Sequence, residues 1–385
     1  HNEPYLYKRS TDYLINNHFF EIEPEKTAFS LDIKPINYPD KCTLSQLHLL
    51  ARHGSRYPDP DTNEGFDKIS KAFSNYKNPF PKRKNMRLIT RGKLESYYDG
   101  LQSRKRYEKF WKNVKYDTDV TKFQSVALFW VGESTMAFSE GIFDGTGPIG
   151  SNKNEPVYIW SLPQMFIACR RWNETVSNNF TFYIEQTYEY GNKTLAPIAE
   201  KMSKKYNINP PLDPQLLPYM FFYCEFWVLH FNRTDTWCEL LSDDELILAS
   251  YYWNMKYYFL YSYGHPLNER LGCYYVTQLV NSVENYLNGT SLMVADMKIG
   301  QGFTQIILLT TLSLKYMQQK VFYWSSTIYF EIYTCTGSDA LIRLVVDFEP
   351  YLIPGCGSEY CKWTKFKNIL GSKINCDYDK MCAYP

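Results

Sequence analysis

The sequence predicts an α/β fold: a doubly wound, mostly parallel sheet interrupted by an inserted, mainly helical cap domain. Apolar runs at residues 45–52, 123–132 and 292–299 are typical of buried strands, and helical spacing follows the second and third of them. The intervening residues 145–287 are dominated by helical patterns. We therefore expect residues 1–144 and 288–385 to form a discontinuous α/β core and residues 145–287 to form a helical cap.

The remaining elements follow from local patterns. Residues 1–40, with several prolines, predict a surface arm, and Thr90 is a candidate N-cap. The pattern around Thr336–Asp339 predicts a β-hairpin, and we expect the tail from Pro354 to be a disulfide-stapled loop. The expected helices are residues 66–77, 90–111, 134–143 and 304–316, and the expected hairpin strands are residues 321–334 and 340–347.

The charge balance excludes several classes of partner. Forty-two Lys plus Arg against 41 Asp plus Glu give a formal net charge of +1 in 385 residues. The net charge is therefore too small to attract nucleic acid or an anionic membrane surface to the chain as a whole. No apolar run is long enough to span a bilayer, so we expect no membrane partner. Aromatic residues make up 17% of the chain, which indicates thick aromatic packing.

Ten cysteines and five glycosylation sequons indicate a secreted protein or one in the lumen of the secretory pathway. Cys224 and Cys238 bracket a short segment and are expected to pair. Cys42 precedes the first strand and Cys335 ends a late one, so a bridge between them would join the two halves of the core. The cysteine and histidine spacings predict no metal site, and we expect no cofactor. The predicted N-glycan acceptors are Asn173, Asn179, Asn192, Asn232 and Asn288.

The first strand ends in a candidate phosphate site. Residues 52–58 read Arg-His-Gly-Ser-Arg-Tyr-Pro directly after an apolar run. Each of Arg52 and Arg56 offers a planar fork of donors that suits a phosphate, and Gly54 permits close approach of the backbone. The His53 imidazole is a candidate nucleophile. Open α/β sheets bind ligands at the carboxyl ends of their strands.

These motifs resemble the histidine acid phosphatases, specifically the multiple inositol polyphosphate phosphatase branch, over about residues 42–382. Residues 46–58 are similar to the family's first strand and signature, and residues 134–143 are similar to its S-x-A-F-x-x-G-L helix. Residues 224–238, 263–273 and 330–333 resemble the cap and late strands of this branch. Residues 354–361 resemble its C-terminal disulfide loop, which implies a Cys356–Cys361 pair. The pairing of Cys169, Cys273, Cys376 and Cys382 stays open.

The resemblance implies the histidine phosphatase fold and a set of residue roles. His53 would be the nucleophile that becomes a phosphohistidine, with Arg52 and Arg56 clamping the phosphate. Three family positions differ: Trp130 stands in place of a third arginine, Gln301 in place of a second histidine, and Phe303 in place of the acid that protonates the leaving alkoxide. Loss of a general acid costs roughly 10²–10⁴ in rate.

Two hypotheses follow from these differences. The first is a catalytically inactive family member, a binding, storage or effector protein with a remnant anion site or an altered small-molecule pocket. The alternative is a weak acid phosphatase or inositol polyphosphate phosphatase that uses His53 with a cap-borne acid or with good leaving groups. Beyond the N-terminal segment the other histidines are His48, His230 and His265, and for His265 we expect a structural role. The oligomeric state stays open.

Overall fold

The structure is a computed structural model that describes residues 36–74, 76–143, 155–157, 165–314 and 324–383. Most of the predicted N-terminal arm lies outside these residues, as do the end of the predicted helix 304–316 and the start of the predicted strand 321–334. The described chain forms two compact units. A helical unit contains Arg56–Ile89 and Asn179–Phe259, and a sheet unit contains residues 36–55, 90–178 and 260–383.

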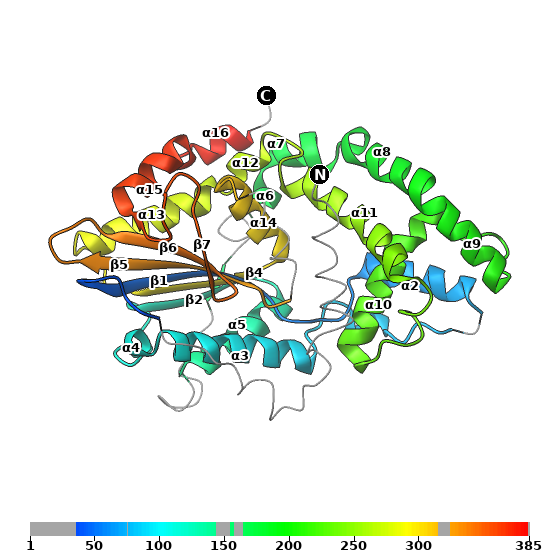
Figure 1. The fold of residues 1–385 in the computed structure, drawn as a ribbon, viewed down its shortest axis with the longest axis horizontal. Helices are drawn as coiled ribbons and strands as arrows, with labels where there is room; N and C mark the ends of the chain where they lie inside the picture. Colours follow the sequence, from blue (N-terminus) through cyan, green and yellow to red (C-terminus); the bar gives the residue numbers. More distant parts are fainter. Residues whose placement is uncertain (1–35, 75, 144–154, 158–164, 315–323, 384–385) are drawn as a thin grey trace. The chain divides into compact units, whose positions relative to one another are not determined.

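The sheet unit is built on one eight-stranded sheet (Figure 1). The order of the strands is β3-β2-β4-β1-β5-β6-β7, and β8 pairs with β6 beside this path. The strands are β1 (Cys42–Arg52), β2 (Thr121–Val126), β3 (Glu155–Val157), β4 (Ala295–Gly300), β5 (Thr327–Cys335), β6 (Leu341–Val346), β7 (Glu349–Tyr351) and β8 (Cys361–Lys362).

The sheet is parallel on one side of β1 and antiparallel on the other. β1 pairs with β4, β4 with β2, and β2 with β3, all parallel. β5 runs antiparallel to both β1 and β6, and the turn between β5 and β6 contains the predicted hairpin residues 336–339. The predicted fold class, an α/β fold with a doubly wound, mostly parallel central sheet, is confirmed, and β5, β6, β7 and β8 add antiparallel pairs on one side of β1.

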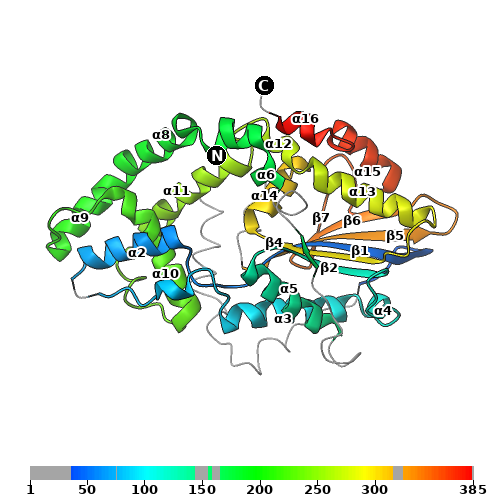
Figure 2. The same ribbon diagram turned by 180° about the vertical axis from the view of Figure 1, so that it is seen from behind.

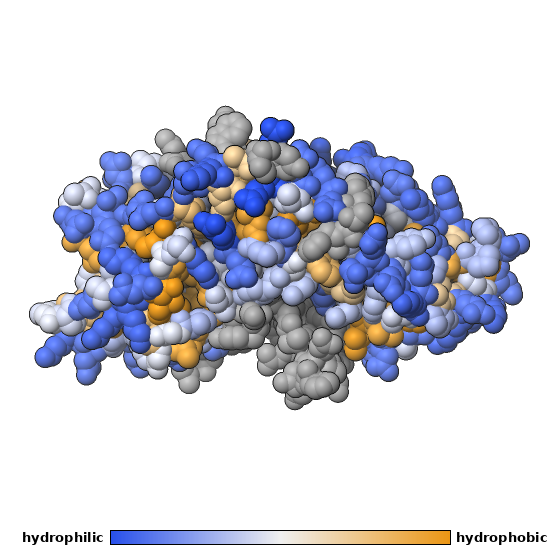
Figure 3. Space-filling model, turned by 90° about the horizontal axis from the view of Figure 1, so that it is seen from above, coloured by the Kyte–Doolittle hydropathy of each residue, from blue (hydrophilic) through white to orange (hydrophobic). Residues whose placement is uncertain are grey.

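Helices cover both faces of this sheet (Figures 1 and 2). One face carries α3 (Thr90–Arg106), α4 (Glu108–Trp111) and α5 (Phe129–Phe143), and the other carries α13 (Cys273–Leu287), α14 (Gly302–Thr311) and α15 (Trp363–Leu370). Burial on both faces explains why consecutive residues at the end of β1, such as Leu49 and Leu50, are apolar. Leu47, Leu49 and Leu50 are all fully buried. Seen from above, most residues on the surface of the molecule are hydrophilic, and hydrophobic ones show between them (Figure 3).

The helical unit packs around stacked aromatic rings. Tyr223 lies between Trp237 and Phe66, with ring centroids 3.9 Å and 4.2 Å away. Offset stacks of this kind add to the burial of apolar surface, and they account for part of the high aromatic content. The main helices of this unit are α2 (Pro60–Ala72), α8 (Phe180–Tyr190), α9 (Ala196–Tyr206), α10 (Leu217–Phe231) and α11 (Asp243–Tyr261).

The compact units differ from the predicted division into residues 1–144 plus 288–385 and residues 145–287. Residues 56–89 group with the helices of residues 179–259, because α2 packs on α10 through contacts such as Phe66 on Tyr223. Residues 165–178 and 260–287 group with the sheet. The inserted cap as a separate folding domain stays a prediction.

Two local predictions were wrong. The predicted strand 123–132 ends at Val126, and Phe129 already begins α5, so Trp130 lies in the first turn of a helix. An apolar run of this length does not by itself distinguish a strand from a buried helix. The tail from Pro354 is not simply a loop, because it contains β8, α15 and α16 (Tyr378–Cys382).

Five disulfides join the ten cysteines. They include the three predicted pairs, Cys42–Cys335, Cys224–Cys238 and Cys356–Cys361. Cys42 and Cys335 face each other at the end of the β1–β5 ladder, as their positions at strand ends predict. The pairs that the sequence left open are Cys169–Cys382 and Cys273–Cys376. Among the helices that the structure describes, none is both long and apolar enough to cross a membrane.

Candidate phosphate site

The candidate site begins where β1 leaves the sheet. The His53 N–H donates to the Gly300 carbonyl over 3.0 Å, which continues the parallel pairing of β1 with β4. On the other side, the Arg52 N–H donates to the Ser326 carbonyl and the Ser325 N–H donates to the His53 carbonyl. His53 is therefore held by hydrogen bonds to both neighbouring segments at the carboxyl end of the strand, where α/β sheets bind their ligands.

The His53 ring is held in one tautomer. It is only 1% exposed, and its Nδ1 lies 2.9 Å from the Gly54 carbonyl oxygen. A carbonyl only accepts hydrogen bonds, so Nδ1 must carry the proton. In the neutral ring, Nε2 then carries the lone pair. This is the form in which an imidazole acts as a nucleophile.

The turn after His53 is fixed by α5 and α3. The Gly54 N–H donates to Ser134 Oγ on α5 over 3.0 Å. The Ser55 N–H and hydroxyl both donate to the Glu95 carboxylate on α3, each over 2.8 Å, and Arg91 Nε donates to the same carboxylate. These bonds connect two helices to Gly54 and Ser55, the two residues that follow His53, and they hold the imidazole in place.

Gly54 and Gly92 allow this close approach. A Cβ atom on Gly54 would lie 2.0 Å from the Gly92 carbonyl oxygen, and one on Gly92 would lie 2.0 Å from the Ser55 carbonyl oxygen. Real Cβ atoms do not come this near a backbone oxygen. The glycine in the signature therefore serves the packing of α3 against the strand end, and its predicted role in access by a ligand stays a prediction.

Arg52 brings a positive charge to the same edge. Its guanidinium carbon lies 3.9 Å from the centre of the Trp324 ring, and that ring lies 5.5 Å from the His53 ring. A guanidinium stacked on an aromatic face keeps its charge and loses little freedom on binding an anion. The structure thus brings together the predicted Arg52 and His53, and it adds Trp324, which the sequence analysis missed.

Trp130 also lies beside His53, with ring centroids 6.5 Å apart. Its ring is half-buried against the core under α5. The resemblance predicted that a family arginine would stand at this position. Here the residue contributes an apolar wall and an indole N–H, and no positive charge.

Gln301 and Phe303 lie at the start of α14. Gln301 directly follows Gly300, the residue that accepts the His53 N–H, and it is the N-cap of the helix. Phe303 is half-buried, with its ring 5.2 Å from Tyr261 and 5.1 Å from Phe166. The backbone N–H groups at a helix N-terminus favour anions. Phe303, the residue that the resemblance assigns to the family's proton-donor position, is thus part of an aromatic cluster.

Gln305 anchors α14 to the strand end. It is fully buried, and its side-chain amide donates to the carbonyls of Leu50 and Ser326 over 3.0 Å and 2.9 Å. Its carbonyl oxygen accepts from the Ser326 hydroxyl. A buried amide with this many partners fixes the register between helix and strand. The sequence analysis missed Gln305 because a single glutamine within an apolar helix carries no local signal.

Arg56 belongs to the helical unit. Its guanidinium lies 3.6 Å from the Asp59 carboxylate, and its Nη1 donates to the Tyr57 carbonyl over 2.7 Å. The ring of His230 is 3.3 Å from the Arg56 carbonyl oxygen, measured from Nε2. Burial lowers the pKa of Arg56 and Asp59 opposes that shift. Whether Arg56 clamps the same phosphate as Arg52 stays a prediction.

The other two histidines of the hypotheses lie elsewhere in the sheet unit. His48 is buried within β1, with Nδ1 4.0 Å from the Asp296 carboxylate, and burial lowers its pKa to about 4. His265 Nδ1 accepts from the Leu267 N–H in the loop before α12 (Asn268–Leu271). Within the part of the chain that the structure describes, no group of three or more His, Cys, Asp or Glu side chains could hold a metal ion.

Asp99 is a buried carboxyl that the sequence analysis did not single out. It lies on α3, and the Ser325 hydroxyl donates to it, next to the Ser325 N–H that bonds His53. Burial raises the pKa of Asp99 well above its usual value, and the charges of Asp347 and Glu95 raise it further against the opposing effect of the Ser325 bond.

Replacing Asp99 with asparagine is expected to stabilise the folded chain relative to the wild type at neutral pH. The gain should be smaller at acidic pH. The raised pKa means that the folded chain holds this proton to a higher pH than the unfolded chain. The associated stability is complete below the unfolded value of 3.8 and is lost as the pH rises through the folded pKa. Thermal unfolding at several pH values from 4 to 7 should show a difference between variant and wild type that grows with pH. A constant difference would contradict the raised pKa.

Together, the fold and the site define a class of protein. A nucleophile-competent imidazole and a stacked guanidinium stand at the carboxyl end of a parallel strand, next to a helix N-terminus, as in α/β proteins that handle phosphoryl groups. The chain belongs to the histidine phosphatase superfamily (branch 2), whose family model matches residues 43–347.

Curated relatives carry phosphatase names. The chain is 22% identical to multiple inositol polyphosphate phosphatase 1 of Dictyostelium discoideum, over 88% of this chain and 67% of that protein. It is 24% identical to a thiamine-repressible acid phosphatase of Schizosaccharomyces pombe, over 70% of this chain and 62% of that protein. The chain thus spans about two thirds of the length of these two relatives.

Solved structures share the fold. The phytase from D. castellii aligns with a TM-score of 0.74 at 17% identity, covering 91% of this chain and 84% of that chain. The Bifidobacterium longum multiple inositol polyphosphate phosphatase, in complex with inositol hexasulfate, aligns with a TM-score of 0.68 at 12% identity, covering 90% of this chain and 96% of that chain. At these identities the likeness concerns the fold.

Proposed function

We propose that this chain binds phosphorylated small molecules at the end of β1, and that His53 accepts a phosphoryl group there from esters whose leaving group needs no proton. The ligand class is an inositol polyphosphate or a similar phosphomonoester. The observation that carries the proposal is the bond between His53 Nδ1 and the Gly54 carbonyl, which leaves the lone pair on Nε2. The phosphatase names of the curated relatives support the same reading.

The chemistry follows from the residues present. The Nε2 lone pair attacks phosphorus, a phosphorus–nitrogen bond forms, and the ester phosphorus–oxygen bond breaks with its electron pair going to the leaving oxygen. Arg52 and the N-terminus of α14 stabilise the negative charge of the transferring group. Water then hydrolyses the phosphohistidine and returns the imidazole to its starting form.

The leaving group decides the rate. An alkoxide is a strong base and needs a proton as the bond breaks, whereas an aryl oxide is a weak base and leaves without one. Phe303, in its aromatic cluster, offers no proton. We therefore propose slow hydrolysis of aryl phosphates and little or no hydrolysis of inositol phosphates, which have alkoxide leaving groups.

A second candidate is the catalytically inactive binding protein. It is favoured by Trp130, whose ring stands 6.5 Å from the His53 ring without supplying a charge. Removing a charged donor from a phosphoryl transfer site typically costs on the order of 3 kcal/mol, or about a hundredfold in rate. In this form the site holds an anion, or a ligand with an apolar part, and does not turn it over.

One assay separates the two candidates. Phosphate release is measured from p-nitrophenyl phosphate and from inositol hexakisphosphate between acidic and neutral pH, for the wild type, His53→Ala and the matched histidine control His265→Ala. The proposal expects release from the aryl ester that His53→Ala lowers at least about 10³-fold and that His265→Ala leaves unchanged. Equal release by all three chains would overturn His53 as nucleophile. No release at all, with retained ligand binding, would establish the second candidate.

The compartment is also part of the proposal. Five disulfides support maturation in the secretory pathway, where thiols are oxidised. Among the five sequons, Asn192, Asn232 and Asn288 are exposed, and Asn173 and Asn179 are half-buried. We propose a secreted glycoprotein.

A further inference from the structure

A second pocket lies in the sheet unit, formed by residues that the phosphate site does not use. It has a volume of about 620 Å³. Three short helices contribute to it: α7 (Arg170–Trp172), α12 and α16, together with the loop before α12. A volume of this size falls in the range of small-molecule sites.

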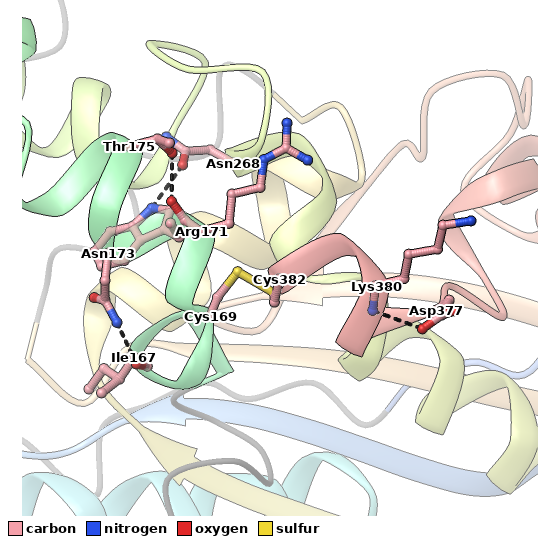
Figure 4. Close-up of a disulfide and its surroundings, with 10 residues drawn as sticks. Ile167, Cys169, Arg171, Asn173, Thr175, Asn268, Asp377, Lys380 and Cys382 are labelled. Carbon is pink, nitrogen blue, oxygen red and sulfur yellow. Dashed lines mark hydrogen bonds between the residues drawn. A yellow bond between two sulfur atoms is a disulfide. The ribbon is translucent and has the colours of Figure 1, made fainter. Parts of the chain in front are cut away.

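The charged groups of this pocket are mainly cationic. Arg171, Arg270 and Lys380 line it, against the single carboxylate of Asp377. The Asp377 carboxylate already accepts the Lys380 N–H over 2.9 Å and so caps α16 (Figure 4). The ion pairs between described residues include none of these three cations, so Asp377 is the one carboxylate of the lining that offsets their charge.

His265 lines the same pocket as the three cations. Burial lowers its pKa, and the positive charge of Arg171 lowers it further. The His265 imidazole, on the loop before α12, thus lies near enough to the Arg171 guanidinium on α7 for its pKa to be affected. At neutral pH the pocket holds three cations, one carboxylate and a neutral imidazole, which leaves a surplus of two positive charges.

The pocket is covalently braced. Cys169, directly before α7, is bonded to Cys382 at the end of α16, and Arg171 and Lys380 extend from the two helices so joined (Figure 4). Cys273, the first residue of α13, is bonded to Cys376, two residues before α16. The Trp172 indole N–H lies 3.1 Å from Asn268 Oδ1, which connects α7 to α12. Cations held on a braced frame lose little entropy when an anion binds.

We propose that this pocket binds a compact anion carrying several phosphate or sulfate groups, at a site separate from the one at the end of β1. The two guanidiniums offer forked donors that suit phosphate and sulfate oxygens, and the ammonium adds a point charge. Leu267 and Met381, also in the lining, provide apolar surface for the carbon part of such a ligand. The pocket thus favours a small molecule that carries several anionic groups.

The test uses the full chain in which two residues of the site at the end of β1 have been replaced. In an Arg52→Gln/His53→Ala chain, calorimetric titration with inositol hexakisphosphate is expected to show one remaining equivalent bound. Adding Arg171→Gln and Arg270→Gln to this chain should weaken its affinity for inositol hexakisphosphate at least about tenfold. Added salt should weaken the affinity of the chain that keeps both arginines. A parallel titration with tripolyphosphate distinguishes a linear phosphate from a ring ester. Both belong to the proposed class.

Arg170→Gln is the matched control, because Arg170 is the exposed neighbour of Arg171 and does not line the pocket. It should leave the binding unchanged, and Lys380→Gln alone should weaken it. The proposal is overturned if the chain without Arg52 and His53 binds neither anion, or if Arg170→Gln weakens binding as much as the pocket variants. Because His53 is absent throughout, the outcome is independent of whether the phosphatase proposal holds. Unchanged unfolding midpoints would show that the variants remain folded.

Discussion

Replacing Phe303 with glutamate and Gln301 with histidine is expected to raise the hydrolysis of alkyl phosphates by about 10²–10⁴-fold. The histidine adds a donor for the phosphate next to Gly300, and the glutamic acid supplies the proton that the alkoxide needs. Both positions lie at the start of α14, beside the strand that holds His53. Phosphate release from inositol hexakisphosphate, compared with that from p-nitrophenyl phosphate, measures the gain.

The control for this variant is Phe303→Gln with Gln301→His, which has a side chain of the same length and no acidic proton. It should gain nothing on the alkyl ester. Phe303 packs on Tyr261 and Phe166, so either replacement should lower stability by about 2–4 kcal/mol, and the folded fraction must be measured in parallel. Equal activity of the two folded variants would refute Phe303 as the position that limits proton donation.

Replacing Gly54 with alanine is expected to destabilise the fold by about 3 kcal/mol or more and to abolish anion binding at the end of β1. The added Cβ would lie 2.0 Å from the Gly92 carbonyl oxygen, so α3 or the strand end must move. Either movement breaks the bonds of Ser55 to Glu95 or of Gly54 to Ser134. Chemical unfolding and anion titration of the same preparation measure both effects.

Gly337→Ala is the matched control for that substitution. Gly337 has a positive φ of 74°, and no atom lies within 4 Å of an added Cβ. It should cost only backbone strain, about 1 kcal/mol, and leave anion binding intact. If both alanine variants lost the same stability, the close contact between α3 and the strand end would not be what requires glycine at position 54.

The part of the site that the sequence predicted is the part made by one continuous segment. Arg52, His53 and Gly54 follow the apolar run of β1, and local order alone places them at the end of the strand. Their supports come from elsewhere in the chain: Glu95 on α3, Ser134 on α5 and Gln305 on α14. These contacts depend on how the helices pack on the sheet. A single polar residue within each helix carries no signal of that packing.

The errors in the predicted elements have a similar cause. Residues 123–132 are apolar apart from Gln124 and Ser125, and in the structure the second half turns into α5, whose Val131 and Phe138 pack in the core. Trp130 was therefore predicted in the wrong element, and its match to the family's arginine position stays a prediction. The tail after Pro354 was predicted as loop because its cysteines dominate the pattern, yet Trp363, Phe366 and Leu370 bury one face of a helix.

The sequence by itself determined the α/β class, the identity of the strand that carries the site and the residues at its end, because burial and turn chemistry act over a few neighbouring residues. It also determined that no arginine, histidine or acid stands at positions 130, 301 and 303. Only the tertiary structure decided which His53 nitrogen holds the proton, since that depends on where the Gly54 carbonyl lies. It alone also brought Arg171, Arg270 and Lys380 around one pocket, because disulfides and packing join helices more than 200 residues apart in the chain.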